Sequence, residues 1–214
     1  MDRTDSEPAT STTGRPVDAS VGVEPGRASV ERRLYLPPWR VDVTGVPRIV
    51  SSAALARVIA AALAAAGAPS PSSIGLILAD DAELAELNAI HMGQTGPTDV
   101  LSFPLLEPDA YPLHEGSTPP PEAHRSASFR LPPGRRPHLG DIVVSVERAI
   151  AQAEAGTGGQ TADVRWSPAD ELRLLVVHGA LHVCGWDHAD PVEAAAMRSL
   201  ERDILSPGHR ERSG

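Results

Sequence analysis

His178-Gly-Ala-Leu-His-Val-Cys-Gly-Trp-Asp-His188 is the stretch around which the fold is predicted, because it places three histidines at the spacing H-x3-H-x5-H. On a helix, His178 and His182 lie one turn apart and project from the same side. Gly185 can adopt the left-handed conformation that ends a helix, so that the chain turns back and His188 approaches the same point. We therefore predict one zinc ion per chain, held by His178, His182 and His188, with the fourth position open as in catalytic zinc sites.

The segment before the histidines carries its own helix signals. Ser167 is an expected N-cap, Pro168 suits the first helical position, and apolar residues then recur at helical spacing. With Gly185 as the stop, the pattern predicts a helix over about residues 168–184. Because this helix has apolar flanks, the zinc site should lie against a core on a rigid element.

The same histidine spacing occurs in zinc peptidases with the pattern H-E-x-x-H-x-x-G-x-x-H. Gly179 stands where those enzymes need a glutamate general base, which disfavours proteolysis. Zinc by itself lowers the pKa of a bound water to about 7, so hydrolysis of another substrate is still open. Asp187 fits either a partner that sets a ring tautomer or a solvated turn residue. Cys184 is expected to be a small buried apolar side chain.

Strand and helix signals alternate along the rest of the chain. We expect strands at about 41–43, 74–79, 99–103 and 139–144, and helices at about 51–66, 80–91, 145–156, 168–184 and from 190 onward. In the last helix, Met197, Leu200 and Ile204 should face inward. Alternation of elements of this length indicates an α/β fold.

The flanking segments differ in composition from this core. Residues 1–33 are rich in Ser, Thr, Pro, Gly and charge and are expected to form a disordered N-terminal extension, with a disordered tail at 207–214. That leaves a single domain at 34–206, interrupted by a Pro/Arg-rich insertion at about 105–138 whose prolines exclude regular structure.

The insertion carries four arginines, Arg125, Arg130, Arg135 and Arg136, with no acid among residues 125–136. A solvated loop is the favoured interpretation. The sharper alternative is that these arginines supply a cationic surface to the site, because the insertion leads directly into the strand at 139–144.

Charge and composition limit the function classes. The formal net charge of −9 disfavours non-specific nucleic-acid binding, although a local basic groove would still act at physiological salt. A single cysteine fits a reducing compartment, no apolar run is long enough to span a bilayer, and the N-terminus has no apolar signal region. We therefore expect a cytoplasmic protein without a membrane partner.

The histidine motif closely resembles the signature of the YbeY endoribonucleases. Two further segments match that family in the same order, namely Leu87-Asn88 followed by Pro97-Thr98-Asp99-Val100-Leu101-Ser102-Phe103-Pro104, and Leu139-Gly140-Asp141-Ile142-Val143-Val144-Ser145. The resemblance covers about residues 40–206 apart from the insertion. It implies a compact α/β domain with a small mixed β-sheet of about four strands packed with helices, and a zincin-like metal helix.

The resemblance also implies the activity. The expected protein is a zinc-dependent, single-strand-specific endoribonuclease that matures the 3′ end of small-subunit ribosomal RNA and takes part in ribosome quality control. Its partners would be single-stranded ribosomal RNA and ribosomal particles in the cytoplasm.

One position departs from the family pattern. An arginine that usually precedes the glycine of the Leu-Asn to Pro-Thr segment is replaced by Met92, with His91 beside it. The site thus lacks an expected cation for a phosphate. Asp99 and Asp141 belong to the matching motifs, but no catalytic residue is assigned beyond the metal site. The alternatives are a ribosome-assembly binding protein with largely structural zinc, and a metal-dependent hydrolase of another substrate.

Overall fold

The computed structural model describes residues 30–46, 48–117, 135–156 and 166–206. Its elements are β1 (Glu31–Leu36), β2 (Trp39–Thr44), α1 (Ser52–Ala65), β3 (Ser73–Ala79), α2 (Asp81–Met92), β4 (Val100–Pro104), the 3₁₀ turn η1 (Pro108–Ala110), β5 (His138–Ser145), α3 (Val146–Ala155), α4 (Pro168–Val183) and α5 (Pro191–Leu205). The α/β class is confirmed. The disorder expected at 1–29 and 207–214 lies outside the described residues.

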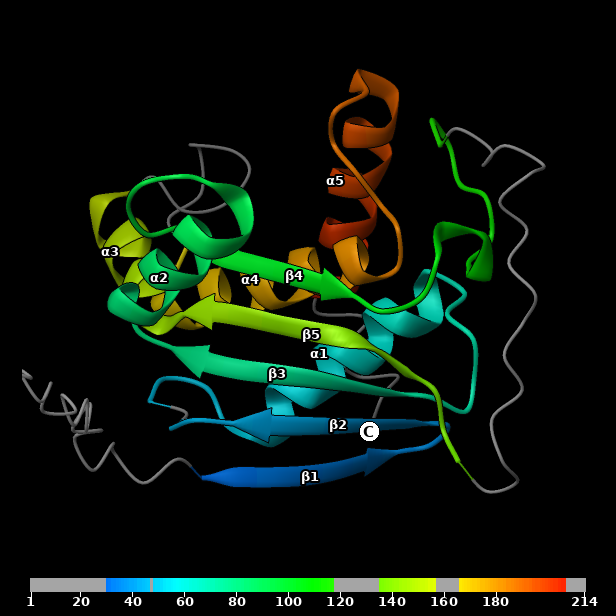
Figure 1. Ribbon diagram of the computed structural model, residues 1–214, viewed down its shortest axis with the longest axis horizontal. Coiled ribbons are helices and arrows are strands. Elements are labelled where there is room, and N and C mark those ends of the chain that lie inside the picture. Colours follow the sequence, from blue (N-terminus) through cyan, green and yellow to red (C-terminus); the bar gives the residue numbers. More distant parts are fainter. Residues whose placement is uncertain (1–29, 47, 118–134, 157–165, 207–214) are drawn as a thin grey trace, which may run out of the picture.

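The strands form one mixed sheet in the order β1-β2-β3-β5-β4 (Figure 1). β2, β3 and β5 run parallel, whereas β1 is antiparallel to β2 and β4 is antiparallel to β5. β4 is therefore an edge strand, paired with β5 alone in the sheet.

The sheet has five strands rather than about four, because β1 was not expected. It begins at Glu31, inside the segment predicted to be disordered, and pairs with β2 from Glu31 opposite Thr44 onward. The Arg33 guanidinium lies 3.0 Å from the Asp42 carboxylate, and Leu34 and Leu36 pack on the core. The charged residues at the start of β1 hide the strand in the sequence, which is why it was not predicted.

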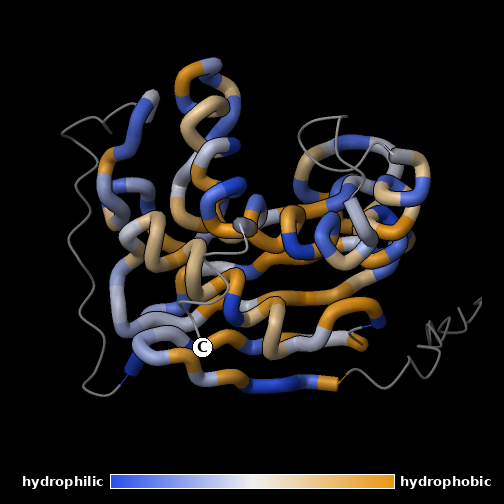
Figure 2. Tube along the Cα trace, turned by 180° about the vertical axis from the view of Figure 1, so that it is seen from behind, coloured by the Kyte–Doolittle hydropathy of each residue, from blue (hydrophilic) through white to orange (hydrophobic). Residues whose placement is uncertain are grey.

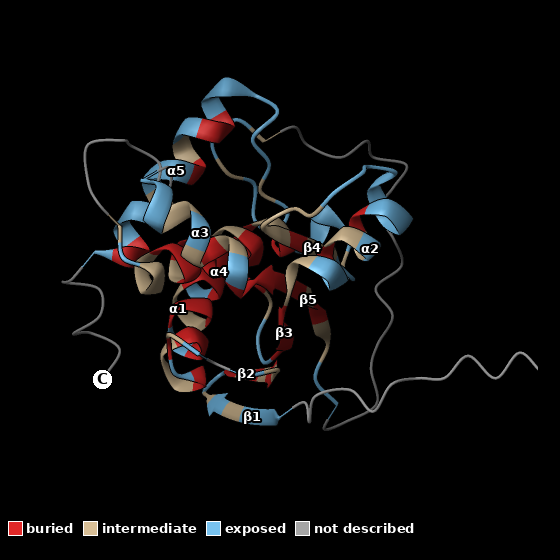
Figure 3. Cartoon of the chain, turned by 90° about the vertical axis from the view of Figure 1, so that its left-hand side faces the viewer, coloured by how far each residue is buried: buried red, intermediate tan, exposed pale blue. Residues whose placement is uncertain are grey.

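The two faces of the sheet bury different cores. On one face, α1 and α4 cover the main core, which includes Leu76 of β3 and Ile142 of β5. On the other face, α2 covers a small cluster around Leu84 and Val143. Figure 2 shows the apolar segments concentrated in the middle strands, and Figure 3 shows the buried residues gathered on the sheet and α4. The helix that carries the histidines therefore has apolar contacts on a rigid sheet, as predicted.

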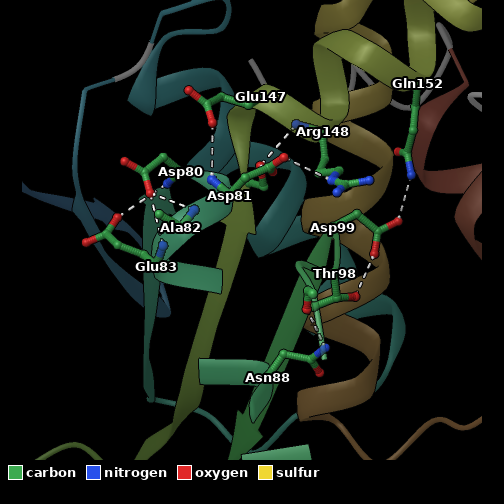
Figure 4. A network of polar contacts seen from close by, with 12 residues as sticks. Asp80, Asp81, Ala82, Glu83, Asn88, Thr98, Asp99, Glu147, Arg148 and Gln152 are labelled. Carbon is green, nitrogen blue, oxygen red and sulfur yellow. Dashed lines mark hydrogen bonds and ion pairs between the residues drawn. The ribbon is translucent and has the colours of Figure 1, made fainter. Parts of the chain in front are cut away.

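Polar contacts fix the start of α3 against the start of α2 (Figure 4). The Ser145 hydroxyl donates to Asp81 Oδ1 at 2.6 Å, and Arg148 Nε lies 3.1 Å from Asp81 Oδ2. The backbone N–H of Asp81 donates to the Glu147 carboxylate at 3.2 Å. These contacts hold α3 in place. Gln152 of α3 then lies within hydrogen-bond distance of Asp99, the residue that precedes β4.

The insertion is partly ordered against the core. It contains η1 and the first residue of β5, which corrects the expectation that it lacks regular structure. Tyr111 is 7% exposed and packs on the main core, which explains why this part of the insertion is ordered. The prolines on which the expectation rested, at 119–121 and 132–133, lie outside the described residues.

α5 shows the inward face expected of it. Met197 and Ile204 are buried and Leu200 is partly buried against the core. None of the helices in the described part of the chain is long and apolar enough to cross a membrane.

Candidate metal centre

Helix α4 begins and ends where its sequence signals place it. The Ser167 hydroxyl accepts the N–H of Asp170 at 3.2 Å, which caps the first turn. At the other end Gly185 has φ +84°, its N–H donates to the His182 carbonyl, and the N–H of Trp186 donates to the Leu181 carbonyl. This pair of hydrogen bonds is a Schellman motif, which reverses the chain after α4.

The reversal brings the three predicted ligands together. His178, His182 and His188 each offer a ring nitrogen, and these nitrogens all lie within 4.8 Å of one another. Nε2 of His178 and Nε2 of His182 are 3.0 Å apart. Ligand nitrogens at tetrahedral positions around zinc, each about 2.1 Å from the ion, would be about 3.4 Å apart. Small side-chain rotations therefore suffice for the three rings to share one ion.

The surroundings of His182 favour a neutral, metal-binding imidazole. Burial, followed by the nearby rings of His178 and His188, lowers the pKa of His182 to about 4. At neutral pH this ring keeps a free lone pair for a metal. Three imidazole nitrogens at these distances form a donor set that fits one divalent metal ion.

A buried glutamate orients one of the rings. Glu201 of α5 is 1% exposed, and its Oε1 lies 2.7 Å from Nδ1 of His178. Nδ1 must then carry the proton, which leaves Nε2 of His178 as the nitrogen that faces the other ligands. A carboxylate in this position fixes the tautomer and makes the ring a stronger ligand.

The sequence analysis did not identify Glu201, although a signal for it existed. Met197, Glu201 and Ile204 share the spacing of one helical face, and the two flanking residues are buried apolar side chains. A carboxylate on the apolar face of a helix needs a polar partner, and here the partner is His178.

Asp187 takes the turn role rather than the ring-orienting one. Its Oδ1 accepts the N–H of His188 at 2.7 Å, and its own N–H donates to Glu193 Oε1 at 2.8 Å. Glu193 also lies 2.7 Å from Nε2 of His114, whose ring stacks on Trp186 with centroids 3.9 Å apart. The ordered part of the insertion thus braces the turn that presents His188.

Two neighbours of the ligands have structural explanations. Cys184 is 1% exposed and burial raises the pKa of its thiol to about 12, so it is the inert buried side chain that was expected. Gly179 packs directly on the sheet, and a Cβ there would lie 2.6 Å from Ile142 Cγ2 and 3.0 Å from Val100 Cγ2. A glutamate at position 179 would therefore clash with β4 and β5 instead of reaching the metal.

Two cavities adjoin the three histidines. The larger, here called the α4–α5 cavity, has a volume of about 310 Å³, and its lining includes His178, His188, Leu175, Met197, Arg198 and Asp99. The smaller has a volume of about 250 Å³ and lies between His182, Gly185 and the segment after β4. His178 and His188 therefore line one hollow, and His182 lines the other.

Of the two motif aspartates, the structure places one beside the histidines. Asp99 lines the α4–α5 cavity, and Gln152 Nε2 donates to its Oδ2 at 3.1 Å (Figure 4). Asp141 instead accepts from His138 Nε2 at 3.0 Å and lines neither cavity.

The expected cation is missing from its usual position. Met92 is 51% exposed at the end of α2 and lines neither cavity, and the ring of His91 packs edge-on against Phe103 with centroids 5.0 Å apart. Arg136 donates to the Pro38 carbonyl at 2.7 Å, at the β1–β2 turn, which lies at the opposite edge of the sheet from β4. Arg125 and Arg130 lie outside the described residues.

Comparison with known proteins points to a single family. A family model described as "Endoribonuclease YbeY" matches residues 46–208. A protein of that name from Roseiflexus sp. (strain RS-1) is 36% identical over 169 residues, which cover 77% of this chain and 90% of that protein. Another from Moorella thermoacetica is 40% identical over 152 residues, which cover 71% and 83%. The solution structure of a Thermotoga maritima protein aligns over 82% of this chain and 94% of its own, with 21% identity and a TM-score of 0.41.

Proposed function

This chain belongs to the YbeY endoribonuclease family, and from that premise we propose that it is a zinc-dependent endoribonuclease that cuts single-stranded RNA. We further propose that it acts in the cytoplasm on ribosomal RNA, in maturation of the 3′ end of the small-subunit RNA and in ribosome quality control, with ribosomal particles as partners.

The observation that carries the proposal is the convergence of His178, His182 and His188, whose ligand nitrogens lie within 4.8 Å of one another. A zinc ion held there supplies positive charge to a phosphodiester in reaction and a bound water of lowered pKa. The chain's own residues prepare that position. Glu201 fixes the tautomer of His178, and burial keeps His182 neutral at physiological pH.

The surroundings of the histidines support an extended polymeric substrate. Each of the two cavities is lined by at least one of the three histidines, so a single strand could place one phosphate at the histidines and its neighbouring nucleotides in the hollows. Gly179 argues against the alternative of a peptidase, because the sheet leaves no room for a general base on that side of α4.

A ribosome-assembly binding protein with largely structural zinc is the second candidate. It is favoured by Met92, which is exposed in the position where a site arginine was expected. A binding protein would associate with ribosomal particles without cleaving RNA. An endoribonuclease must bind RNA and must also offer a charged site for the phosphate that reacts.

A cleavage assay separates the two. Zinc-loaded protein is incubated with labelled unstructured RNA, the same RNA as a duplex, a casein-type peptide and purified ribosomal particles. The variant His182→Ala removes a ligand, and His138→Ala removes a histidine at the start of β5 that lines neither cavity. Zinc content per chain is measured for every sample.

The endoribonuclease proposal predicts cleavage of the single strand by the unaltered protein and by His138→Ala. His182→Ala should lose both the zinc and the cleavage. Particle association without cleavage of any RNA would favour the binding protein instead. Cleavage that persists at full rate in His182→Ala would come from a contaminating nuclease and would remove the support for the proposal.

A further inference from the structure

The α4–α5 cavity contains a cation that the family resemblance did not indicate. Arg198 of α5 lines this cavity together with the ligands His178 and His188, and none of the other described arginines lines either cavity. We propose that the α4–α5 cavity binds one nucleotide of the RNA strand next to the metal site, and that Arg198 binds the phosphate of that nucleotide. The proposal rests on the endoribonuclease function proposed above.

The size and walls of the cavity fit a nucleobase. Its volume of about 310 Å³ is at the small end of the range for ligand pockets, about 300–1,000 Å³. Leu174 and Leu175 of α4, Ala194 and Met197 of α5, and Val100 of β4 supply apolar wall. A flat base that packs against these aliphatic side chains removes apolar surface from water. This favourable contribution does not require a particular base sequence.

Arg198 is free to bind a phosphate. It is exposed, and it makes no hydrogen bond or ion pair with another residue in the part of the chain that the structure describes. A guanidinium presents a planar fork of donors that matches two phosphate oxygens. It therefore supplies the charge that Met92 cannot.

The other polar groups of the cavity direct the phosphate toward Arg198. Asp99, Glu171 and Glu201 present carboxylates, and Oε2 of the buried Glu201 has no hydrogen-bond partner among the described residues. Carboxylates repel a phosphate and accept hydrogen bonds from the N–H groups of a base. The base therefore enters between α4 and α5, and its phosphate stays at the exposed guanidinium.

His178 and His188 set the position of the neighbouring phosphate. They line the same cavity as Arg198, so a nucleotide held there by its base and one phosphate places the adjoining phosphodiester beside the ligands. Arg198 is thus a substrate-binding residue, and its loss should weaken RNA binding whether or not metal is present.

The test measures binding as well as cleavage. Binding of a fluorescent single-stranded RNA to metal-free protein is followed by anisotropy over a range of salt concentrations. Arg198→Gln is compared with Arg202→Gln, which removes an arginine one turn further along α5 that is also exposed but lines neither cavity. Zinc content and kcat and KM for RNA cleavage are then measured with the metal-loaded proteins.

We expect Arg198→Gln to raise the Kd for RNA about tenfold, the lower end of the range for loss of a hydrogen bond to a charged group, because this side chain is exposed. The slope of log K against log salt should fall by about 0.7, as for one phosphate contact on a single strand. KM should rise with zinc content unchanged, and Arg202→Gln should match the unaltered protein. Equal RNA binding and equal salt slopes for Arg198→Gln and Arg202→Gln would overturn the inference.

A second pair of variants tests the cavity itself. Ala194→Leu fills the wall from a buried position, and Ala195→Leu adds the same atoms at the exposed neighbour. RNA binding should weaken only in Ala194→Leu, and the zinc content of this variant should be retained. Equal RNA binding by the two variants would show that the base does not bind in this cavity. Failure of the unaltered protein both to bind and to cleave RNA would overturn the proposed function, and this inference with it.

Discussion

Replacement of Glu201 should change zinc affinity and the free energy of unfolding independently of each other. Glu201 is 1% exposed, Oε1 contacts Nδ1 of His178 at 2.7 Å, and Oε2 has no hydrogen-bond partner in the described part of the chain. The carboxylate therefore makes His178 a better ligand, but it is a buried charge with one oxygen left without a hydrogen bond. The carboxylate thus raises zinc affinity but costs folding stability. The two substitutions described next should therefore change zinc affinity and the free energy of unfolding differently.

The expected sizes follow from these contacts. Glu201→Gln keeps an oxygen that accepts from Nδ1 of His178 and loses the charge, so zinc affinity should fall about tenfold, or about 1.4 kcal/mol. Glu201→Leu removes the acceptor, and the loss should approach about a hundredfold, or about 2.7 kcal/mol. The metal-free Glu201→Leu protein should be at least as stable as the unaltered one, because a costly buried carboxylate has been replaced by an apolar side chain of similar size.

Zinc affinity is measured at neutral pH by competition with a chromophoric chelator, and stability of the metal-free proteins by urea unfolding. Asp203→Asn is the control, since it removes a carboxylate from an exposed position of α5. If Glu201→Leu keeps the zinc affinity of the unaltered protein and lowers only the free energy of unfolding, Glu201 is a folding residue and the argument is wrong.

Three further outcomes follow from the site. Gly179→Ala should lower the free energy of unfolding by about 1–3 kcal/mol in denaturant titrations, because its Cβ would lie 2.6 Å from Ile142 Cγ2; an unchanged midpoint would contradict this packing. The pKa of His182 is lowered from 6.5 to about 4, so in metal-free protein the unfolded state gains a proton first as the pH falls between these values. Stability should drop over that range by at most about 3 kcal/mol, and His182→Gln should show a flatter pH dependence in urea titrations; parallel profiles would refute the assignment. Zinc at a hundredfold excess over its Kd should raise the free energy of unfolding by about 2.7 kcal/mol, as seen in thermal melts, and His188→Ala should lose this gain while its metal-free stability is unchanged, because His188 is exposed.

The parts predicted well from the sequence are those with local causes. Helix α4 was predicted at about 168–184 and runs from Pro168 to Val183, because its N-cap and its glycine stop act within a few residues of the chain. The position of His188 could be predicted for the same reason, since a local signal, the glycine at 185, indicates where the chain turns back. Strand β1 was not predicted, because its charged residues do not indicate a strand locally. They are accommodated through pairing with β2, where Asp42 lies beside Arg33.

The site divides in the same way. The sequence by itself determined the three histidines and their approach to one point, because helical periodicity and one left-handed glycine set those positions. Only the tertiary structure decided that Glu201 orients His178, that Asp99 rather than Asp141 faces the site, and that Arg198 lines the cavity next to it. These assignments depend on how α5 and β4 pack against α4, and such contacts between distant segments follow from the folded core and leave little pattern in the local sequence.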